Sequence, residues 1–145
     1  MMIKRIPQIV IDTNVFYGAI LSPLGASYLL LSLCGQGYFD IHVSVPLVLE
    51  YEGTAKRQLA SLPITARDID VLIDYICSIA TPHEIFFLWR PFLSDPKDEM
   101  VLELAVTAKC DAIVTFNKRD FRGCEKFGVR LLTPVELLRE IGVAK

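Results

Sequence analysis

The chain has 145 residues and a mass of 16.3 kDa, which fits one domain and leaves little room for a second. Hydrophobic residues make up 52% of it, charged residues 22%, and the mean hydropathy is +0.42, so a sizeable core is available and a disordered chain is excluded. Fifteen Lys and Arg against seventeen Asp and Glu give a formal charge of −2, which argues against a protein that grips nucleic acid by bulk positive charge.

Cysteine usage favours neither a zinc site nor a disulfide framework. The four cysteines are Cys34, Cys77, Cys110 and Cys124. No two of them form a C-x-x-C pair, and neither histidine lies near one of them in sequence. We predict four buried thiols in a reducing cytoplasm and expect no signal peptide.

One long stretch, residues 13–39, contains no charged side chain and raises the question of a membrane span. Residues 22–25 interrupt it with Ser-Pro-Leu-Gly, and its longest strongly apolar piece, residues 28–34, is far shorter than the ~20 residues of a spanning helix. We predict two buried helices joined at residues 22–25 and no contact with a membrane.

Taken in chain order, the first half alternates apolar runs with helical patterns. Residues 8–11 predict a strand buried on both faces, residues 25–34 a helix and residues 39–45 a second strand. Pro46 suits the first turn of a long helix that reaches about residue 62.

A second long helix is predicted to begin after Thr65, which has Asp68 three residues later as a capping-box partner. Its inner face follows the 3.6-residue period and consists of Ile69, Leu72, Ile73, Ile76 and Ala80. No regular structure is predicted for the aromatic segment 82–92.

In the second half, Asp95 and Pro96 predict a helix to about residue 109. The inner stripe of this helix is Val101, Leu104, Ala105 and Ala108. Residues 111–115 predict a turn into a buried strand, residues 128–132 a last short strand, and Thr133 the start of a final helix. Strands that alternate with helices indicate one α/β domain over residues 1–145, with a mainly parallel sheet between helical layers.

Ligands of open parallel sheets bind at the carboxyl ends of the strands, so the polar residues that follow the strands are the candidates for a site. Asp12 follows the first strand and is trailed by Thr13 and Asn14. Asn117 follows the strand at 111–115, with Asp120 three residues later. Two further acids, Glu50 and Asp98, stand early in predicted helices.

Each acid also has a structural interpretation. On this interpretation, Asp12 caps the following helix, and Asp98 interacts with the positive end of a helix dipole. Glu50 and Asp120 are then ordinary solvated acids. The combination favours a cation site, because clustered carboxylates repel one another unless a cation neutralises them. Oxygen ligands without Cys or His select Mg²⁺ or Mn²⁺ over zinc.

Four stretches, in the right order, resemble the motifs of PIN-domain proteins. These are Ile9–Val15 around Asp-Thr-Asn, Val43-Ser44 followed by Leu49-Glu50-Tyr51, Asp95–Glu99, and Ala112–Thr115 continued by Asn117–Phe121. The resemblance covers roughly residues 8–140 and is strongest to the bacterial and archaeal PIN proteins described as toxins of toxin–antitoxin pairs.

The resemblance implies a three-layer α/β/α fold whose acidic metal site consists of Asp12, Glu50 and Asp98. Many members have Asp two residues after the motif threonine, where this chain has Asn117. An asparagine carbonyl can still coordinate Mg²⁺ without adding charge, and Asp120 either takes over as a ligand or orders the loop. This departure puts a second metal ion in question more than the first.

The activity implied by the resemblance is metal-assisted hydrolysis of RNA phosphodiester bonds. Asp12 and Asp98 would hold Mg²⁺, which polarises phosphate and lowers the pKa of a bound water, and Glu50 would complete the shell. Thr13, Asn14 and Thr115 would hydrogen-bond carboxylates or phosphate.

Contacts to RNA are predicted for Lys118, Arg119 and Arg122, because residues 118–130 hold five Lys and Arg against two acids. The same segment also fits an ordinary solvated loop, with Phe121 pointing to the core.

Two classes of function remain open. One is a cytoplasmic Mg²⁺-dependent ribonuclease toxin with a cognate antitoxin, and the other is a non-catalytic PIN module that binds RNA or protein, for which Asn117 is the best argument. An aspartate-nucleophile phosphatase is disfavoured, because Asn14 stands where that chemistry needs an acid. The apolar composition and the aromatic side chains Phe86, Phe87 and Trp89 predict a homodimer.

Overall fold

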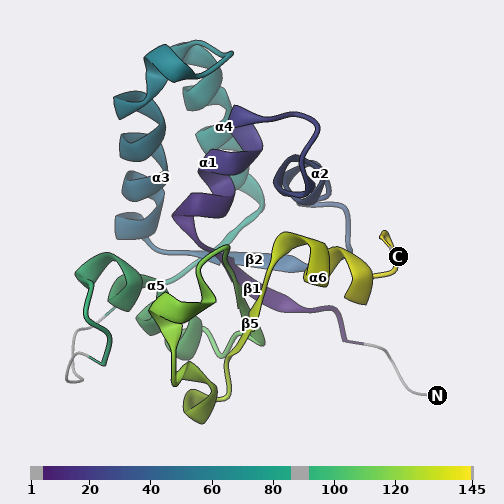
Figure 1. Cartoon of the computed structure of the whole chain (residues 1–145), viewed down its shortest axis with the longest axis vertical. Helices are drawn as coiled ribbons and strands as arrows, with labels where there is room; N and C mark the ends of the chain where they lie inside the picture. The colour runs from purple at the N-terminus through teal and green to yellow at the C-terminus, as the bar shows by residue number, and fades with distance from the viewer. Residues whose placement is uncertain (1–4, 86–91, 145) are drawn as a thin grey trace.

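In the described part of the chain, five short parallel strands form the centre of the molecule (Figure 1). The computed structural model describes residues 5–85 and 92–144. The strands are β1 (Gln8–Ile11), β2 (Asp40–Val43), β3 (Thr81–Pro82), β4 (Ala112–Val114) and β5 (Arg130–Leu132). Their order in the sheet is β3-β2-β1-β4-β5, and every described pair is parallel. The central pair, β1 and β4, is aligned with Ile9 beside Ala112 and Ile11 beside Val114.

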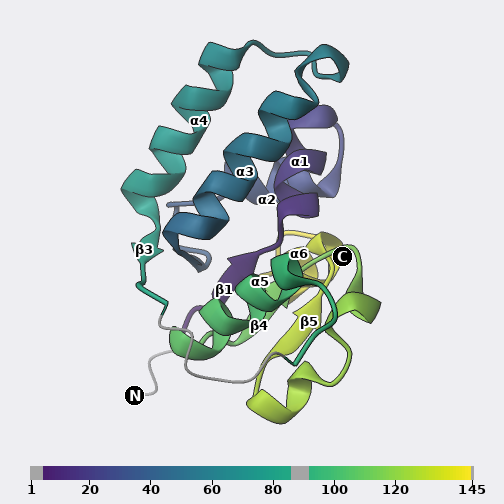
Figure 2. The ribbon, with the colours of Figure 1, turned by 90° about the vertical axis from the view of Figure 1, so that its left-hand side faces the viewer.

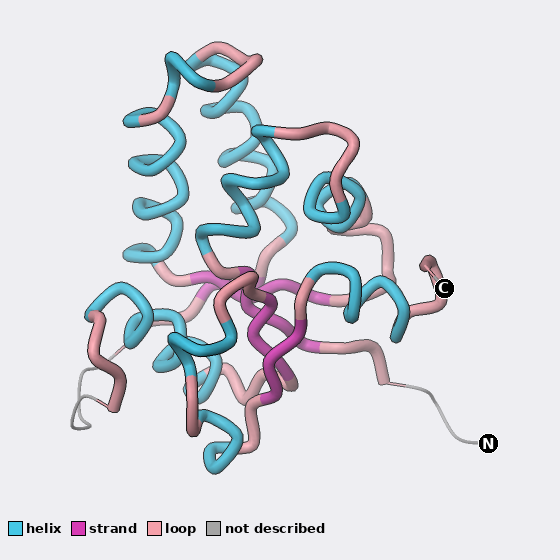
Figure 3. The backbone as a smooth tube through the Cα atoms, viewed as in Figure 1, coloured by secondary structure: helices cyan, strands magenta, loops and turns pink. Residues whose placement is uncertain are grey.

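Helices cover both faces of this sheet. The chain first runs from β1 to β2 to β3, and α1 (Thr13–Leu21), α2 (Ala26–Ser32), α3 (Val45–Arg57) and α4 (Ala66–Ile79) lie on one side (Figures 1 and 2). It then returns across the sheet to β4 through α5 (Pro96–Thr107). Because right-handed crossovers in opposite directions place their helices on opposite faces, α5 lies on the other side. Figure 3 shows the strands between these two groups of helices, so the predicted three-layer α/β/α fold is confirmed.

Side-chain caps begin the longer helices where the sequence predicts. The Ser44 hydroxyl accepts from the Leu47 N–H at the start of α3, and Asp95 accepts from the Lys97 N–H at the start of α5. Thr65 and Asp68 form the predicted capping box of α4. A second capping box, formed by Thr133 and Glu136, begins α6 (Pro134–Glu140), which packs against α2.

Several boundaries differ from the predictions. The second strand ends at Val43, because the Ser44 cap already begins α3 at Val45. That helix ends at Arg57 and is followed by a short 3₁₀ turn, η1 (Leu59–Ser61). Strand β3 was not predicted, because two residues that include a proline carry no strand pattern.

Within residues 5–85 and 92–144, no single helix is long and apolar enough to cross a membrane. Helices α1 and α2 reach that length only as a pair, and the pair is bent by 100°. The predicted break at residues 22–25 is confirmed, since it separates the two helices.

All four cysteines are free thiols, but they are not all buried. Cys34, Cys110 and Cys124 lie in the core, whereas Cys77 is exposed, so the prediction of four buried thiols is wrong at this position. Ile69, Ile73 and Ile76 form the inner face of α4, and Cys77 lies at the margin of that face, where it lines an open pocket instead of packing in the core. Phe86, Phe87 and Trp89, on which the homodimer prediction depends, lie outside the described residues.

Candidate active site

Asp12 lies where β1 ends and α1 begins, and its carboxylate is held from both sides. Its backbone N–H donates to the Val114 carbonyl of β4 at 2.9 Å, which extends the sheet pairing by one residue. The carboxylate Oδ1 accepts from the Thr13 N–H at 2.8 Å, and Oδ2 accepts from the Thr115 hydroxyl at 2.7 Å. Only 7% of Asp12 is exposed, so these bonds fix a buried acid at the carboxyl edge of the sheet.

The Thr115 hydroxyl joins the ends of β1 and β4. It is fully buried, donates to Asp12, and accepts from the Asn117 N–H at 3.0 Å and from the Asn14 amide at 3.4 Å. The side-chain oxygen Oδ1 of Asn14 in turn accepts from the Phe116 N–H at 3.4 Å. Residues about one hundred positions apart in the sequence therefore meet in one network. Their places directly after two strands of the sheet predicted that they share this edge.

Tyr51 supports this edge from α3, a role that the sequence did not reveal. Its hydroxyl donates to the Ile11 carbonyl, and its ring stacks on Phe16 with centroids 4.7 Å apart. Burial raises the pKa of Tyr51 well above its usual value, and the Asp12 charge adds to the shift, so this hydroxyl stays a donor. The one available signal was its place beside Glu50 in the second motif, on the inner face of the helix.

Asp98, in the first turn of α5, shares the neighbourhood of Asp12. The pKa of Asp98 is raised to about 6. Burial is the largest cause, and the charges of Asp12, Asp120 and Asp95 add to the shift. The pKa of Asp12 is raised by burial and by the charge of Asp120, against the lowering effect of the Thr115 and Thr13 hydrogen bonds. The Asp12 charge thus disfavours the ionised form of Asp98, and the Asp120 charge disfavours the ionised forms of both Asp12 and Asp98.

Glu50 is bound differently. Its Oε1 lies 3.4 Å from Lys97 Nζ at the start of α5 and 3.7 Å from the Arg57 guanidinium, and it accepts from the Thr54 hydroxyl at 3.1 Å. These contacts place Glu50 beside the amino end of α5, where Lys97 directly precedes Asp98 in the chain. Two cations neutralise its charge there.

The segment after β4 lies on the surface over the same edge. Asn117 and Asp120 are exposed, as are the three predicted RNA contacts Lys118, Arg119 and Arg122. Lys118 forms an ion pair of 2.6 Å with Glu136 of α6. Phe121, fully buried at the end of η2 (Lys118–Phe121), anchors the segment from below.

The donors at this edge fit a hard divalent cation. Asp12, Asp98 and Asp120 offer carboxylate oxygens whose repulsion such an ion would relieve, and Asn117 offers an amide oxygen. In the part of the chain that the structure describes, no three His, Cys, Asp or Glu side chains converge into a complete metal-binding group. Mg²⁺ tolerates such a site, because it keeps several waters and binds through one or two carboxylates.

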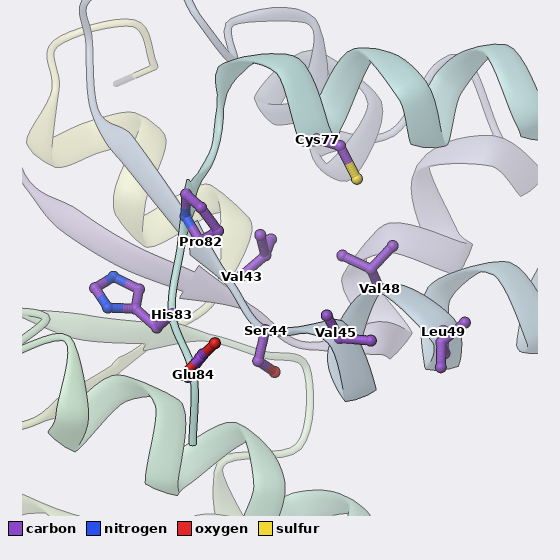
Figure 4. A pocket seen from close by; sticks show the side chains of 9 residues that line it. All are labelled: Val43, Ser44, Val45, Val48, Leu49, Cys77, Pro82, His83 and Glu84. Atoms are coloured by element: carbon purple, nitrogen blue, oxygen red, sulfur yellow. The ribbon is translucent and has the colours of Figure 1, made fainter. Parts of the chain in front are cut away.

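A cavity of about 450 Å³ lies farther along the sheet, where β2 and β3 end (Figure 4). Its walls are mostly apolar and include Val43, Val48, Cys77 and Pro82. None of the predicted site residues lines it. The chemistry expected from the sequence therefore belongs to the carboxylate edge and not to this cavity.

Comparison with known proteins agrees with this architecture. The family model described as PIN domain matches residues 8–119, most of the chain, and the chain belongs to that family. No curated protein matches the sequence significantly.

Among solved structures, the chain is similar to a chain in the crystal structure of VapBC2 from Rickettsia felis bound to a DNA fragment from their promoter. The TM-score is 0.60 at 14% sequence identity, over 87% of this chain and 98% of that chain. At this identity the likeness concerns the fold, which it supports independently of the family model.

Proposed function

We propose that this PIN-domain protein is a metal-dependent ribonuclease that hydrolyses RNA phosphodiester bonds. The observation that carries the proposal is the buried Asp12 carboxylate, which Thr115 holds between β1 and β4 with the charges of Asp98 and Asp120 beside it. Repulsion among carboxylates opposes folding. A group of carboxylates at one edge of the sheet therefore favours a functional site over a stabilising role.

Asp12 and Asp98 would hold Mg²⁺ or Mn²⁺, with Asp120 and the Asn117 carbonyl on the exposed side. The bound ion would supply charge stabilisation at a phosphate oxygen and a more acidic water. Thr115 and the Thr13 N–H favour the ionised form of Asp12 and orient its carboxylate, because both donate to its oxygens. Asn14 fixes Thr115 and the start of the following loop.

Glu50 would act at the same edge after leaving its ion pairs. Lys97 and Arg57 are exposed cations on flexible side chains, so exchanging them for water or for the ligand shell is inexpensive. In the shell, Glu50 would orient the attacking water. Lys97, freed by this exchange, would add to the positive charge that Lys118, Arg119 and Arg122 offer to the RNA backbone.

The biological role that we propose is that of a toxin held inactive by a cognate antitoxin in the cytoplasm, and we expect the protein to be a homodimer. Membership of the PIN family and the fold shared with a chain of the VapBC2 structure support this role. Copurification of the protein with the product of a neighbouring reading frame, followed by loss of RNA cleavage in the complex, would test it.

A non-catalytic PIN module that binds RNA or protein is the second candidate. It is favoured by one observation, the ion pairs in which Lys97 and Arg57 already occupy the Glu50 carboxylate. RNA binding without cleavage at any concentration of Mg²⁺ or Mn²⁺ would support this alternative.

Cleavage of labelled RNA by the purified protein separates the two candidates. We expect cleavage with Mg²⁺, none with EDTA, and none for Asp12→Asn. Asp74→Asn is the matched control, because Asp74 is an exposed acid on α4. Equal activity of wild type and Asp12→Asn would exclude the proposed site.

A further inference from the structure

Phe116 is a large apolar side chain in an unusual position. It stands between Thr115, which is fully buried, and Asn117, which is exposed, and half of its own surface (50%) faces solvent. Single exposed hydrophobic residues are common and need no explanation by themselves. The position of this ring, however, is fixed from two sides and lies beside the proposed active site.

The first constraint is on the backbone. The Phe116 N–H donates to the Asn14 side-chain oxygen at 3.4 Å, and the neighbouring Asn117 N–H donates to Thr115 at 3.0 Å. The loop that carries the ring is therefore tied to the same hydrogen-bond network that holds Asp12.

The second constraint is on the ring. A Cβ placed on Gly18 of α1 would lie 3.3 Å from Cε2 of Phe116 and 3.4 Å from the Ser27 hydroxyl. Glycine in the middle of a helix costs about 0.5–1 kcal/mol relative to alanine, and here it leaves the space in which the ring rests. One part of the ring packs on α1, and the rest is presented to solvent.

The ring is displaced from the carboxylates along α1. Gly18 lies six residues after Asp12, which corresponds to about 9 Å along a helix axis. The chain beyond the ring continues into exposed basic residues, Lys118 and Arg119. A polyanion whose phosphate lies at Asp12 would thus find an aromatic side chain and basic side chains on the one segment that follows β4.

We propose that Phe116 is a positioning residue that stacks on an unpaired RNA base adjacent to the scissile phosphate. The inference rests on the proposed function, since it assumes that a nucleic acid is bound at Asp12. Stacking on a preset aromatic ring needs no particular base, because every base has a π-face, and it requires a base that is not paired. A protein partner is the less favoured occupant, because the chain next to the ring is polar and basic rather than apolar.

Binding is measured in the Asp12→Asn background, so that RNA is not cleaved, with a short fluorescein-labelled single-stranded oligoribonucleotide. Loss of one base stack predicts that Phe116→Ala weakens binding about 5- to 150-fold. Phe116→Trp should keep the affinity, while Phe116→Leu, which is apolar but not aromatic, should lose most of it. Tyr38→Ala is the matched control, because Tyr38 is 41% exposed and lies just before β2, at the opposite edge of the sheet.

An RNA series with a single abasic position identifies the stacked base. One abasic position should weaken binding to the protein that retains Phe116 and have little further effect on Phe116→Ala, because the two losses remove the same contact. In the active protein, Phe116→Ala should raise KM more than it lowers kcat, since the ring touches no reacting atom.

Unchanged RNA binding by Phe116→Ala, with cleavage by wild type intact, would overturn this inference and leave the proposed function standing. Equal weakening at all abasic positions would also overturn it. If Phe116→Ala instead impaired only the binding of a protein partner, the ring would belong to that interface. If wild type neither bound nor cleaved RNA, the proposed function and the inference would fail together.

Discussion

Two polar networks on the central strands differ in the way their charges are satisfied. One begins at the amino end of β1 and β2 and contains Gln8, Asp40, His42 and His83; we call it the Gln8–His42 network. The other is the carboxylate edge of Asp12, Asp98 and Asp120, with Thr115. Both include buried polar side chains, Asp12 and His42 each being 7% exposed.

In the Gln8–His42 network, donors and acceptors alternate. The Gln8 amide nitrogen donates to Asp40 at 2.9 Å, so its oxygen faces His42 Nε2, 2.6 Å away, and accepts from it. Neutral His42 then accepts at Nδ1 from His83 Nε2 at 2.8 Å. Burial lowers the pKa of His42, with the His83 charge as the next cause, which agrees with a neutral ring.

At the carboxylate edge, the corresponding side chains are all acceptors when ionised, and the Asp120 charge raises the pKa of both Asp12 and Asp98. Buried polarity alone therefore does not indicate function. A network whose donors and acceptors are paired within the chain supports the fold. A network that places like charges together is stabilised by a ligand of opposite charge, such as a cation.

The largest expected effect is on catalysis at the carboxylate edge. Asp12→Asn should lower the rate of RNA cleavage about 10²- to 10⁴-fold, because the carboxylate that holds the ion is lost. Asparagine remains a good N-cap, so the start of α1 should persist, which circular dichroism would verify. Cleavage by Asp12→Asn at the wild-type rate would remove the distinction between the two networks.

Thr115→Val should be strongly destabilising. Valine has the same shape but removes the hydroxyl that donates to Asp12 and accepts from Asn14 and Asn117. A loss of about 2–3 kcal/mol in the free energy of unfolding is expected, measured by urea denaturation. Thr107→Val on the exposed end of α5 serves as the control and should change stability by less than about 0.5 kcal/mol.

His42→Ala should lower stability without affecting cleavage. The substitution leaves the Gln8 oxygen and the His83 N–H without their partner and should cost about 1–2 kcal/mol of unfolding free energy at neutral pH. The cleavage rate of the folded variant should equal that of wild type. A large loss of activity at full folding would show that the two networks are coupled.

The two networks should respond to pH with opposite signs. The folded-state pKa of Asp98, about 6, exceeds the ordinary pKa of 3.8 for this side chain, so wild type should gain stability relative to Asp98→Asn as pH falls from about 6 to about 4. The pKa of His42 is lowered from 6.5, so its contribution is present above about pH 6.5 and is lost as pH falls through the folded-state pKa. Thermal melting of wild type, Asp98→Asn and His42→Ala across this range measures both differences. Parallel curves for wild type and Asp98→Asn would contradict the clustering of the acids.

Much of the fold follows from local chemistry that a sequence displays. Apolar runs that end in polar residues predicted β1 and β4, and the capping box of Thr65 and Asp68 fixed the start of α4. Strand β3 was missed because a pairing of two residues depends on β2 being present beside it. The burial of Cys77 was predicted wrongly because cysteine is usually buried, whereas this side chain lies at the margin of the inner face of α4 and lines an open pocket.

The site was predictable to the extent that it depends on strand ends. The meeting of Asp12, Asn14 and Thr115 follows from the parallel pairing of β1 and β4. Tyr51 was missed because a tyrosine on an inner helix face looks like ordinary core. The ion pair of Glu50 with Lys97 depends on how α3 packs beside α5, which no local pattern contains. The metal-binding and catalytic roles of these residues stay predictions.

Thermal melting with and without Mg²⁺ tests whether Asp12 and Asp98 act together through a divalent ion. Wild type should gain roughly 5–10 °C in Tm at Mg²⁺ about one hundred times its Kd, because the ion binds the folded state. Asp12→Asn and Asp98→Asn should gain almost nothing, and without Mg²⁺ they should melt at or above the wild-type temperature, since one source of repulsion is gone. If wild type gained no stability from Mg²⁺ or Mn²⁺ and both substitutions lowered Tm in their absence, these carboxylates would be structural and would not form a metal site.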